Sequence, residues 1–188
     1  MDSRRFFYDV RKEVAVHCGE KIDMEFVIKE IDRVEQERRA EIIRRSFGTV
    51  AQQLGIENED SPARQTILAG KKTGEESDQS DLVYGAYTEI DGKETMVGSA
   101  QITKKEDGVY VLKKLAVLPA YRHNGIGRAL IGFGCDEVRK RGGTILRITV
   151  IEADTVLKNW YLKLGFKHMG TEKYTHLPYT VGQMEYTL

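Results

Sequence analysis

The residues best suited to chemistry are residues 122–127 (RHNGIG), between an apolar strand pattern and an apolar helix pattern. Glycine at 125 and 127 leaves the backbone open, so successive N–H groups at a helix start can point outward, where the helix dipole favours an anion. Arg122 and Arg128 add positive charge on both sides. The spacing predicts a pyrophosphate cradle, although a lone G-x-G is more often only a tight turn.

Two other phosphate-binding motifs fit less well. A dinucleotide-binding turn reads G-x-G-x-x-G, whereas Leu130 stands in place of the third glycine, which packs the helix against the sheet. Residues 70–73 (GKKT) lack the G-x-x-x-x-G-K-[ST] frame of a phosphate loop and lie in a polar segment. An enzyme that uses NAD is therefore the least favoured alternative.

Composition bounds the remaining possibilities. The chain has 188 residues, with 29 Lys plus Arg against 29 Asp plus Glu, so no global charge favours nucleic acid or an anionic membrane. No segment approaches the roughly 20 apolar residues of a membrane span, and residues 1–21 lack the uninterrupted apolar core of a signal peptide. Cys18 and Cys135 have neither metal-ligand nor disulfide-framework spacing, which predicts no metal site and a cytoplasmic protein with free thiols.

Hydrophobic periodicity predicts the elements that must position the motif. Apolar residues recur at helical spacing over residues 4–18 and 33–54, around a short strand at 26–31, and residues 55–81 form a long polar loop. The expected later strands are residues 82–90, 95–102, 109–118, 144–151, 166–170 and 182–188. Helices are expected over residues 125–141 and from Asp154, a plausible N-cap. The strand–helix–strand order around the motif implies one parallel pair in a mixed sheet.

Two motifs together resemble the GNAT superfamily of N-acetyltransferases. One is the strand sequence LAVLP followed by R-x-x-G-x-G, and the other is YLKLGF at residues 161–166, which is similar to the family's Y-x-K-x-G-F signature. The resemblance covers residues 82–188 well and 26–54 loosely. It implies an α/β (α+β) domain of the acyl-CoA N-acyltransferase type, with a mixed, mostly antiparallel sheet flanked by helices. Residues 1–25 are then a helical extension, and 26–188 a single domain.

The resemblance also implies a binding site for acetyl-CoA, as acyl donor. Backbone groups of Leu115, Ala116 and Val117 would bind the pantetheine arm as a neighbouring strand does. The pyrophosphate would be wrapped by Arg122, His123, Asn124, Gly125, Ile126, Gly127 and Arg128. Tyr161 would lie near the sulfur and protonate the departing thiolate, although by periodicity alone it is a core aromatic beside Trp160.

The sequence departs from the family pattern at two places. Asp154 stands where many members carry a pantetheine-binding Asn, so cofactor contact and helix capping are both open roles. The strand before LAV offers no carboxylate as a base, which leaves Glu152, at a strand end, as the best candidate, although a solvated loop glutamate is the commoner case. His176 and Tyr179 are weaker candidates. Cys135 reads as a packed hydrophobe, in agreement with direct transfer.

We therefore expect an acetyl-CoA-dependent enzyme that acetylates a primary amine of an unidentified acceptor by direct attack in a ternary complex. The alternative is a non-catalytic acyl-CoA-binding sensor or regulatory module. Residues 33–81 and 174–181 are expected to form the acceptor wall, and acidic residues at 57, 59, 60, 75, 76 and 78 permit a cationic acceptor. Partners are acetyl-CoA and the amine, without nucleic acid or membrane, and the protein is a monomer or a homodimer.

Overall fold

The structure, a computed structural model, describes residues 24–31, 35–55, 81–175 and 177–188. Within these residues, seven strands form one sheet in the order β1-β2-β3-β4-β5-β7-β6. Their bounds are β1 Val27–Glu30, β2 Leu82–Ile90, β3 Lys93–Glu106, β4 Val109–Val117, β5 Ile145–Ile151, β6 Lys167–Lys173 and β7 Thr180–Thr187. Every adjacent pair is antiparallel except β4 with β5. The predicted mixed, mostly antiparallel sheet is confirmed.

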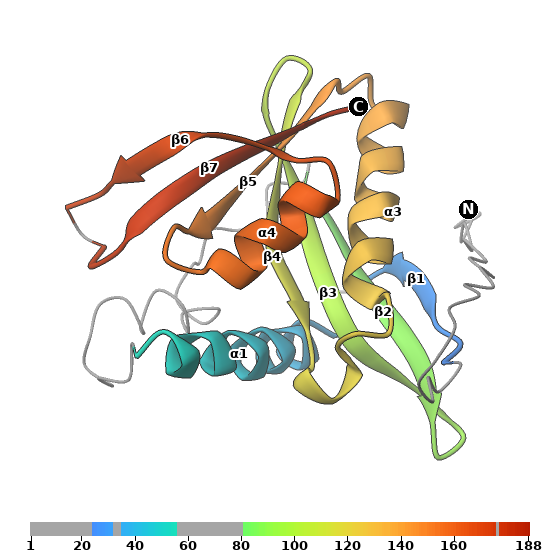
Figure 1. Cartoon of the computed structure of the whole chain (residues 1–188). Helices are drawn as coiled ribbons and strands as arrows, with labels where there is room; N and C mark the ends of the chain where they lie inside the picture. The colour runs from blue at the N-terminus through green and yellow to red at the C-terminus, as the bar shows by residue number, and fades with distance from the viewer. Residues whose placement is uncertain (1–23, 32–34, 56–80, 176) are drawn as a thin grey trace.

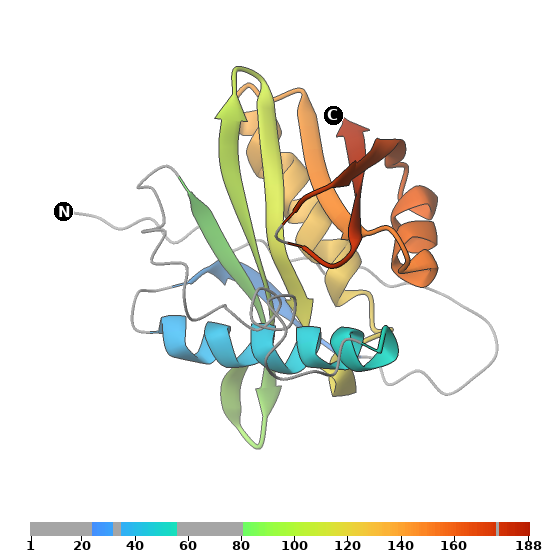
Figure 2. The ribbon, with the colours of Figure 1, turned by 90° about the vertical axis from the view of Figure 1, so that its left-hand side faces the viewer.

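Helices cover both faces of this sheet (Figure 1). They are α1 Gln36–Gln53, α3 Ile126–Lys140 and α4 Thr155–Lys163, with a short 3₁₀ turn, η2 Pro119–Tyr121, after β4. Figure 2 shows α1 crossing in front of the central strands while α3 lies behind them. α1 packs on β3 and β4, and α3 on β2, β3 and β4. Among the described helices, none combines the length and apolar character needed to cross a membrane.

The β2–β3 hairpin is longer than its apolar pattern predicts. Asp91 and Gly92 both have positive φ, 51° and 73°, as a two-residue turn between twisted strands requires. Ile90 therefore pairs directly with Lys93, and the ladder reaches polar residues outside the expected strand 95–102. Hydrogen bonding set by the turn, rather than burial, extends this strand.

Several expectations lie outside the described residues. These are the helix at residues 4–18, most of the polar loop at 55–81 and Cys18. The expected helix at 33–54 corresponds to α1, and the remaining strand and helix predictions agree with the structure to within a few residues at their ends. The division into a 1–25 extension and a 26–188 domain stays a prediction.

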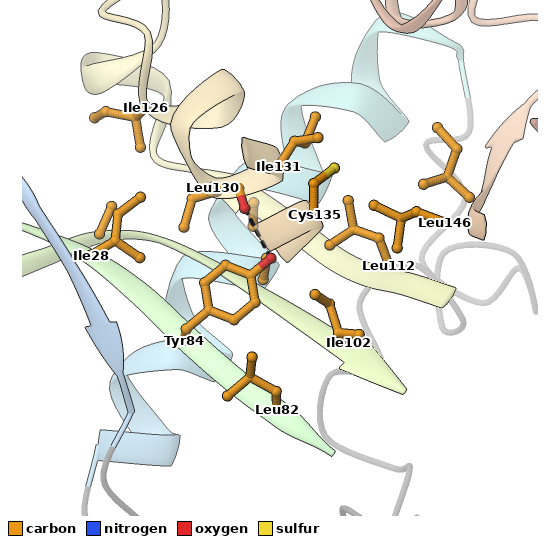
Figure 3. Packing of buried hydrophobic residues seen from close by; sticks show 14 of the residues in the cluster. Ile28, Leu82, Tyr84, Ile102, Leu112, Ile126, Leu130, Ile131, Cys135 and Leu146 are labelled. Atoms are coloured by element: carbon orange, nitrogen blue, oxygen red, sulfur yellow. Dashed lines mark hydrogen bonds between the residues drawn. The ribbon is translucent and has the colours of Figure 1, made fainter. Parts of the chain in front are cut away.

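The main core lies between the sheet and α3 (Figure 3). The Tyr84 side chain is fully buried there, and its hydroxyl donates to the Leu130 carbonyl oxygen at 2.9 Å. Gly134 lets α3 approach this ring, since an added Cβ would lie 2.5 Å from the Tyr84 hydroxyl oxygen. Cys135 is also buried here, and burial raises the pKa of its thiol to about 11, so it packs as the sequence predicted.

A polar contact fixes α1 on the opposite face of the sheet. Arg39 Nη2 donates to Gln101 Oε1 at 2.8 Å, and Gln101 Nε2 donates to Asp81 Oδ2 at 2.7 Å. Burial lowers the pKa of Arg39 to about 10, and Asp81 acts in the opposite direction. The amino-terminal half of α1 is thereby tied to β3.

Candidate active site

The parallel strands β4 and β5 are paired over only the first part of their length. They pair only from Val109 to Val111 on β4, opposite Ile145 to Arg147 on β5. β4 continues to Val117 and β5 to Ile151 without pairing to each other. Beyond the paired segment, backbone groups on the β5 side of β4 are therefore free of a β5 partner, as a strand-like ligand requires.

A bulge bends β4 in this unpaired half. Ser99 pairs with Ala116 and Gln101 with Lys113, so two β4 residues, Lys114 and Leu115, oppose the single β3 residue between them. Lys114 has a φ of 52°, in the left-handed region. Because a bulge bends its strand and increases the local twist, this one directs the end of β4 away from β5.

Hydrogen-bond direction decides which residues of β4 face the open edge. The Leu118 N–H donates to the Val97 carbonyl oxygen on β3 at 2.9 Å. Peptide groups alternate along a strand, so those of Ala116 also face β3, whereas those of Leu115 and Val117 face the β5 side. The predicted backbone contacts to a ligand are thus open to Leu115 and Val117, while Ala116 is used within the sheet.

The loop after β4 presents the start of α3. His123 and Gly125 both have positive φ, 67° and 80°, and Gly125 is the N-cap without a side-chain cap. The first bond of the helical ladder joins the Ala129 N–H to the Gly125 carbonyl oxygen at 3.0 Å. The N–H groups of Ile126, Gly127 and Arg128 precede it and have no intrahelical acceptor, which makes this end suited to an anion.

Two polar side chains of the loop, Arg122 and Asn124, donate hydrogen bonds to other groups of the protein. Arg122 Nη2 donates to the Ser46 carbonyl oxygen and to Thr49 Oγ1, both at 2.9 Å, and its Nε donates to the Val117 carbonyl oxygen at 3.2 Å. Burial lowers the pKa of this guanidinium. Asn124 Nδ2 lies 3.3 Å from the carbonyl oxygens of Tyr121 and Arg122.

For Arg122, contact with a pyrophosphate stays a prediction. Its guanidinium is committed to α1 and to the end of β4, whereas Arg128, on the first turn of α3, is exposed. Ile126 is 1% exposed and can contribute only its backbone. The loop therefore offers backbone N–H groups and the charge of Arg128.

Trp160 connects α4 to the start of α3. An added Cβ at Gly127 would lie 3.4 Å from Cη2 of its indole. The same ring packs edge-on against Tyr161, with centroids 4.8 Å apart. The second glycine of the motif therefore provides room for an aromatic contact as well as an open backbone.

Tyr161 is a buried tyrosine whose hydroxyl keeps its proton. The residue is 6% exposed, and its ring packs on Phe166 with centroids 5.4 Å apart. Burial, and then the charge of Asp154, raise its pKa well above the usual tyrosine range. Within the described residues, its hydroxyl makes no hydrogen bond. Such a group is protonated at neutral pH, and its raised pKa also makes it a weaker acid than an ordinary tyrosine.

Asp154 caps α4, one of the two roles left open by the sequence. Its Oδ1 accepts from the Leu157 N–H at 2.9 Å. This bond satisfies an N–H group that has no partner within the helix, as an N-cap carboxylate commonly does. A contact between its other oxygen and a ligand stays a prediction.

Glu152 forms a charged strap between three elements. One of its oxygens accepts from Lys158 Nζ on α4, and Oε2 lies 3.0 Å from His168 Nε2 on β6. The hydrogen bond from Lys158, and then that from His168, lower the pKa of the carboxyl. Gly182 leaves room for the strap, since an added Cβ would lie 2.4 Å from Oε2.

Tyr179 and His176 are the weaker candidates for the site. Tyr179 is partly buried, and burial raises its pKa, while His176 falls outside the described residues. Sequence reasoning missed Ser46 and Thr49, whose contact with Arg122 crosses more than 70 positions and leaves no local signal. The link from Trp160 to Gly127 was missed for the same reason.

Comparisons with known proteins assign the chain to a family. The sequence profile described as the Acetyltransferase (GNAT) family matches residues 44–166, and the chain belongs to that family. It is accordingly an acyltransferase enzyme, with the fold that the two motifs predicted. A search of curated proteins found no match.

Solved structures show the same fold at low sequence identity. PaiA N-acetyltransferase from Thermoplasma acidophilum, in complex with coenzyme A, is 22% identical with a TM-score of 0.69, over 88% of this chain and 100% of that one. The ribosomal-protein-S18-alanine N-acetyltransferase from Escherichia coli is 20% identical with a TM-score of 0.60, over 87% and 94%. An aminoglycoside 6'-N-acetyltransferase complexed with coenzyme A is 17% identical with a TM-score of 0.57, over 85% and 96%.

Proposed function

We propose that this enzyme transfers the acetyl group of acetyl-CoA to a primary amine by direct attack in a ternary complex. The observation that carries the proposal is the continuity of two backbone surfaces: the open edge of β4 leads, through a loop of a few residues, to the uncapped start of α3. An extended chain ending in a pyrophosphate matches this sequence of surfaces. Acetyl-CoA has that construction.

The donor is held mainly by backbone groups. Leu115 and Val117 offer strand-like hydrogen bonds to the pantetheine arm, and the Val117 carbonyl oxygen shares its acceptor capacity with Arg122. The N–H groups of residues 126–128 receive the pyrophosphate, and the exposed Arg128 adds charge. Because the glycines carry no side chain, the phosphates can approach the backbone closely.

The chemistry then needs a polarised carbonyl and a proton for sulfur. The neutral amine attacks the thioester carbon, a C–N bond forms, and the C–S bond breaks as the tetrahedral intermediate collapses. Backbone N–H groups on the open edge of β4 stabilise the developing oxyanion. Tyr161 donates its proton to the departing thiolate, and the proton released from nitrogen leaves through solvent and restores the hydroxyl.

We propose that Glu152 has a positioning role in this scheme rather than that of a base. Both of its oxygens are occupied by Lys158 and His168, and its lowered pKa makes it a weak proton acceptor. The strap that it forms joins the end of β5 to the helix that carries Tyr161. We propose that the amine loses its proton to water.

The experiment that tests this function is an acetylation screen. Purified protein is incubated with acetyl-CoA and polyamines, aminoglycosides or peptides with free amino termini, and release of the CoA thiol is measured. We expect release above the rate of hydrolysis with at least one amine, with the acetyl group on nitrogen by mass spectrometry. Transfer only to hydroxyl compounds would contradict the amine assignment.

A further inference from the structure

We propose that Arg122 is a positioning residue that couples occupancy of the loop at 122–127 to the carboxyl-terminal half of α1. This inference rests on the proposed function, because it requires coenzyme A to bind at that loop. It adds a link between the donor site and the wall expected to receive the acceptor. The hydrogen bonds of the Arg122 guanidinium provide that link.

The Arg122 guanidinium contacts two different elements of the fold. Its Nε reaches the Val117 carbonyl oxygen on the open edge of β4, and its Nη2 reaches the Ser46 carbonyl oxygen and Thr49 Oγ1 on α1. A planar guanidinium fixes the directions of these bonds relative to one another. One side chain therefore connects the strand proposed to bind pantetheine with α1, and its backbone lies in the loop.

The two halves of α1 are linked to the rest of the protein by different side chains. Its amino-terminal half is tied to β3 through Arg39 and Gln101, and Arg38 Nη2 lies 3.5 Å from the Met96 carbonyl oxygen. In the carboxyl-terminal half, within the described residues, the side-chain hydrogen bonds to other elements come from Arg122. Arg122 therefore supplies the polar contacts of this half to other elements, beside the apolar packing of Phe47 and the burial of Ala51.

The loop at 122–127 has an unfavourable backbone conformation next to Arg122. His123, next to Arg122, has a φ of 67°, in the left-handed region that residues with a side chain rarely adopt. The loop thus holds strain that a ligand bonded to its N–H groups would help to offset. Fixing the loop also fixes the Arg122 fork, and α1 loses freedom without any contact to the ligand.

Hydrogen–deuterium exchange with coenzyme A as the probe tests this coupling without knowledge of the acceptor. In the wild-type protein, we expect saturating coenzyme A to slow exchange over residues 119–130 and over residues 45–54. The slowing over 45–54 should be about fivefold or more, the lower end of ordinary coupling between two sites. In Arg122→Met, the loop should still be protected, whereas the added protection of residues 45–54 should be lost.

Two further variants keep the test informative if Arg122→Met is poorly folded. Arg122→Lys retains the charge but cannot form the same fork, so it should also lose the transmitted protection. Thr49→Val removes one acceptor on α1 and leaves the loop intact, so it should reduce the protection of residues 45–54 alone. Calorimetric binding of coenzyme A is measured for each variant to confirm that the donor site is filled.

Several results would overturn the coupling. Protection of the loop without any change at residues 45–54 in the wild-type protein would show that the two regions are independent. Faster exchange of α1 in Arg122→Met, with the coenzyme A response of residues 45–54 retained, would make Arg122 a static brace only. A folded protein that does not bind coenzyme A would remove the proposed function, and this inference with it.

Discussion

The hydroxyl of Tyr161 is the group on which the proposed chemistry most depends. Tyr161→Phe should lower kcat by about 100-fold, the lower range for loss of a general acid, with acetyl-CoA affinity changed by less than about twofold. Stability should hardly change, because the hydroxyl makes no hydrogen bond within the described residues. Steady-state kinetics and thermal unfolding measure the two effects.

Tyr84→Phe is the matched control, because that buried hydroxyl donates to the Leu130 carbonyl oxygen. It should lose about 1 kcal/mol of stability and retain turnover. Unchanged turnover in Tyr161→Phe, against an acceptor that the wild-type enzyme uses well, would remove the acid role.

The raised pKa of Tyr161 has a consequence for the pH profile. A proton donor is active while it is protonated, and a pKa above its usual range extends that state to higher pH. We expect kcat to show no falling limb from this group even at about pH 10, where a tyrosine of ordinary pKa would be half ionised. A falling limb in that range that disappears in Tyr161→Phe would contradict the assignment.

Glu152 is expected to matter for position and little for proton transfer. Glu152→Gln should leave the shape of the pH profile of kcat/KM unchanged and lower the thermal midpoint slightly, since the carboxylate strap to Lys158 and His168 is weakened. Lys158→Met removes the other side of the strap and should behave alike. A fall in kcat of about 100-fold or more in Glu152→Gln alone would restore it as the base.

At the scale of elements, the two glycines at the start of α3 differ in backbone conformation and in surroundings. Gly125 has a φ of 80°, so Gly125→Val places a β-branched residue in a left-handed conformation and should weaken acetyl-CoA binding by at least about tenfold. Gly127 has an ordinary helical backbone, and an added Cβ would contact the Trp160 ring at 3.4 Å and Val117 Cγ2 at 3.9 Å. Gly127→Ala should therefore weaken acetyl-CoA binding much less than Gly125→Val does.

Fluorescence titration can measure both variants. Trp160 is the single tryptophan of the chain, and its ring lies against the loop where the ligand is proposed to bind. Equal affinities for Gly125→Val and the wild-type protein would show that the left-handed turn is not needed for the ligand.

α3 itself offers a matched pair of glycine substitutions. Gly134→Ala would place a Cβ 2.5 Å from the Tyr84 hydroxyl oxygen and 2.8 Å from Ile102 Cδ1, and should destabilise the fold by about 1–3 kcal/mol. Gly132 is exposed with nothing within 4 Å, so Gly132→Ala should stabilise the helix by up to about 1 kcal/mol. Urea unfolding of both variants checks the two signs, and stabilisation by Gly134→Ala would contradict the close packing of α3.

At the scale of the whole molecule, local patterns predicted the elements well because each carries its own period and its own stop. Asp91-Gly92, the glycines after α3 and the cap at Asp154 all act over a few residues. The ends of β3 were less predictable, since polar residues there are held by pairing rather than by burial. The parallel pairing of β4 with β5 followed from the strand–helix–strand order.

The site was predictable only as far as its motifs are local. The loop and Tyr161 could be proposed as site residues because each lies in a motif that is contiguous in the sequence. The commitment of Arg122 to α1, the strap at Glu152 and the bulge that opens β4 depend on contacts between distant segments, which a single sequence does not display.

Calorimetric titration of the folded protein with acetyl-CoA, beside NADH and ATP, tests the central claim most directly. We predict saturable binding of one acetyl-CoA per chain, no comparable binding of the other two nucleotides, and a clear loss of affinity in Gly125→Val. Absence of acetyl-CoA binding by a folded sample would mean that residues 122–127 only turn the chain, and would contradict the account.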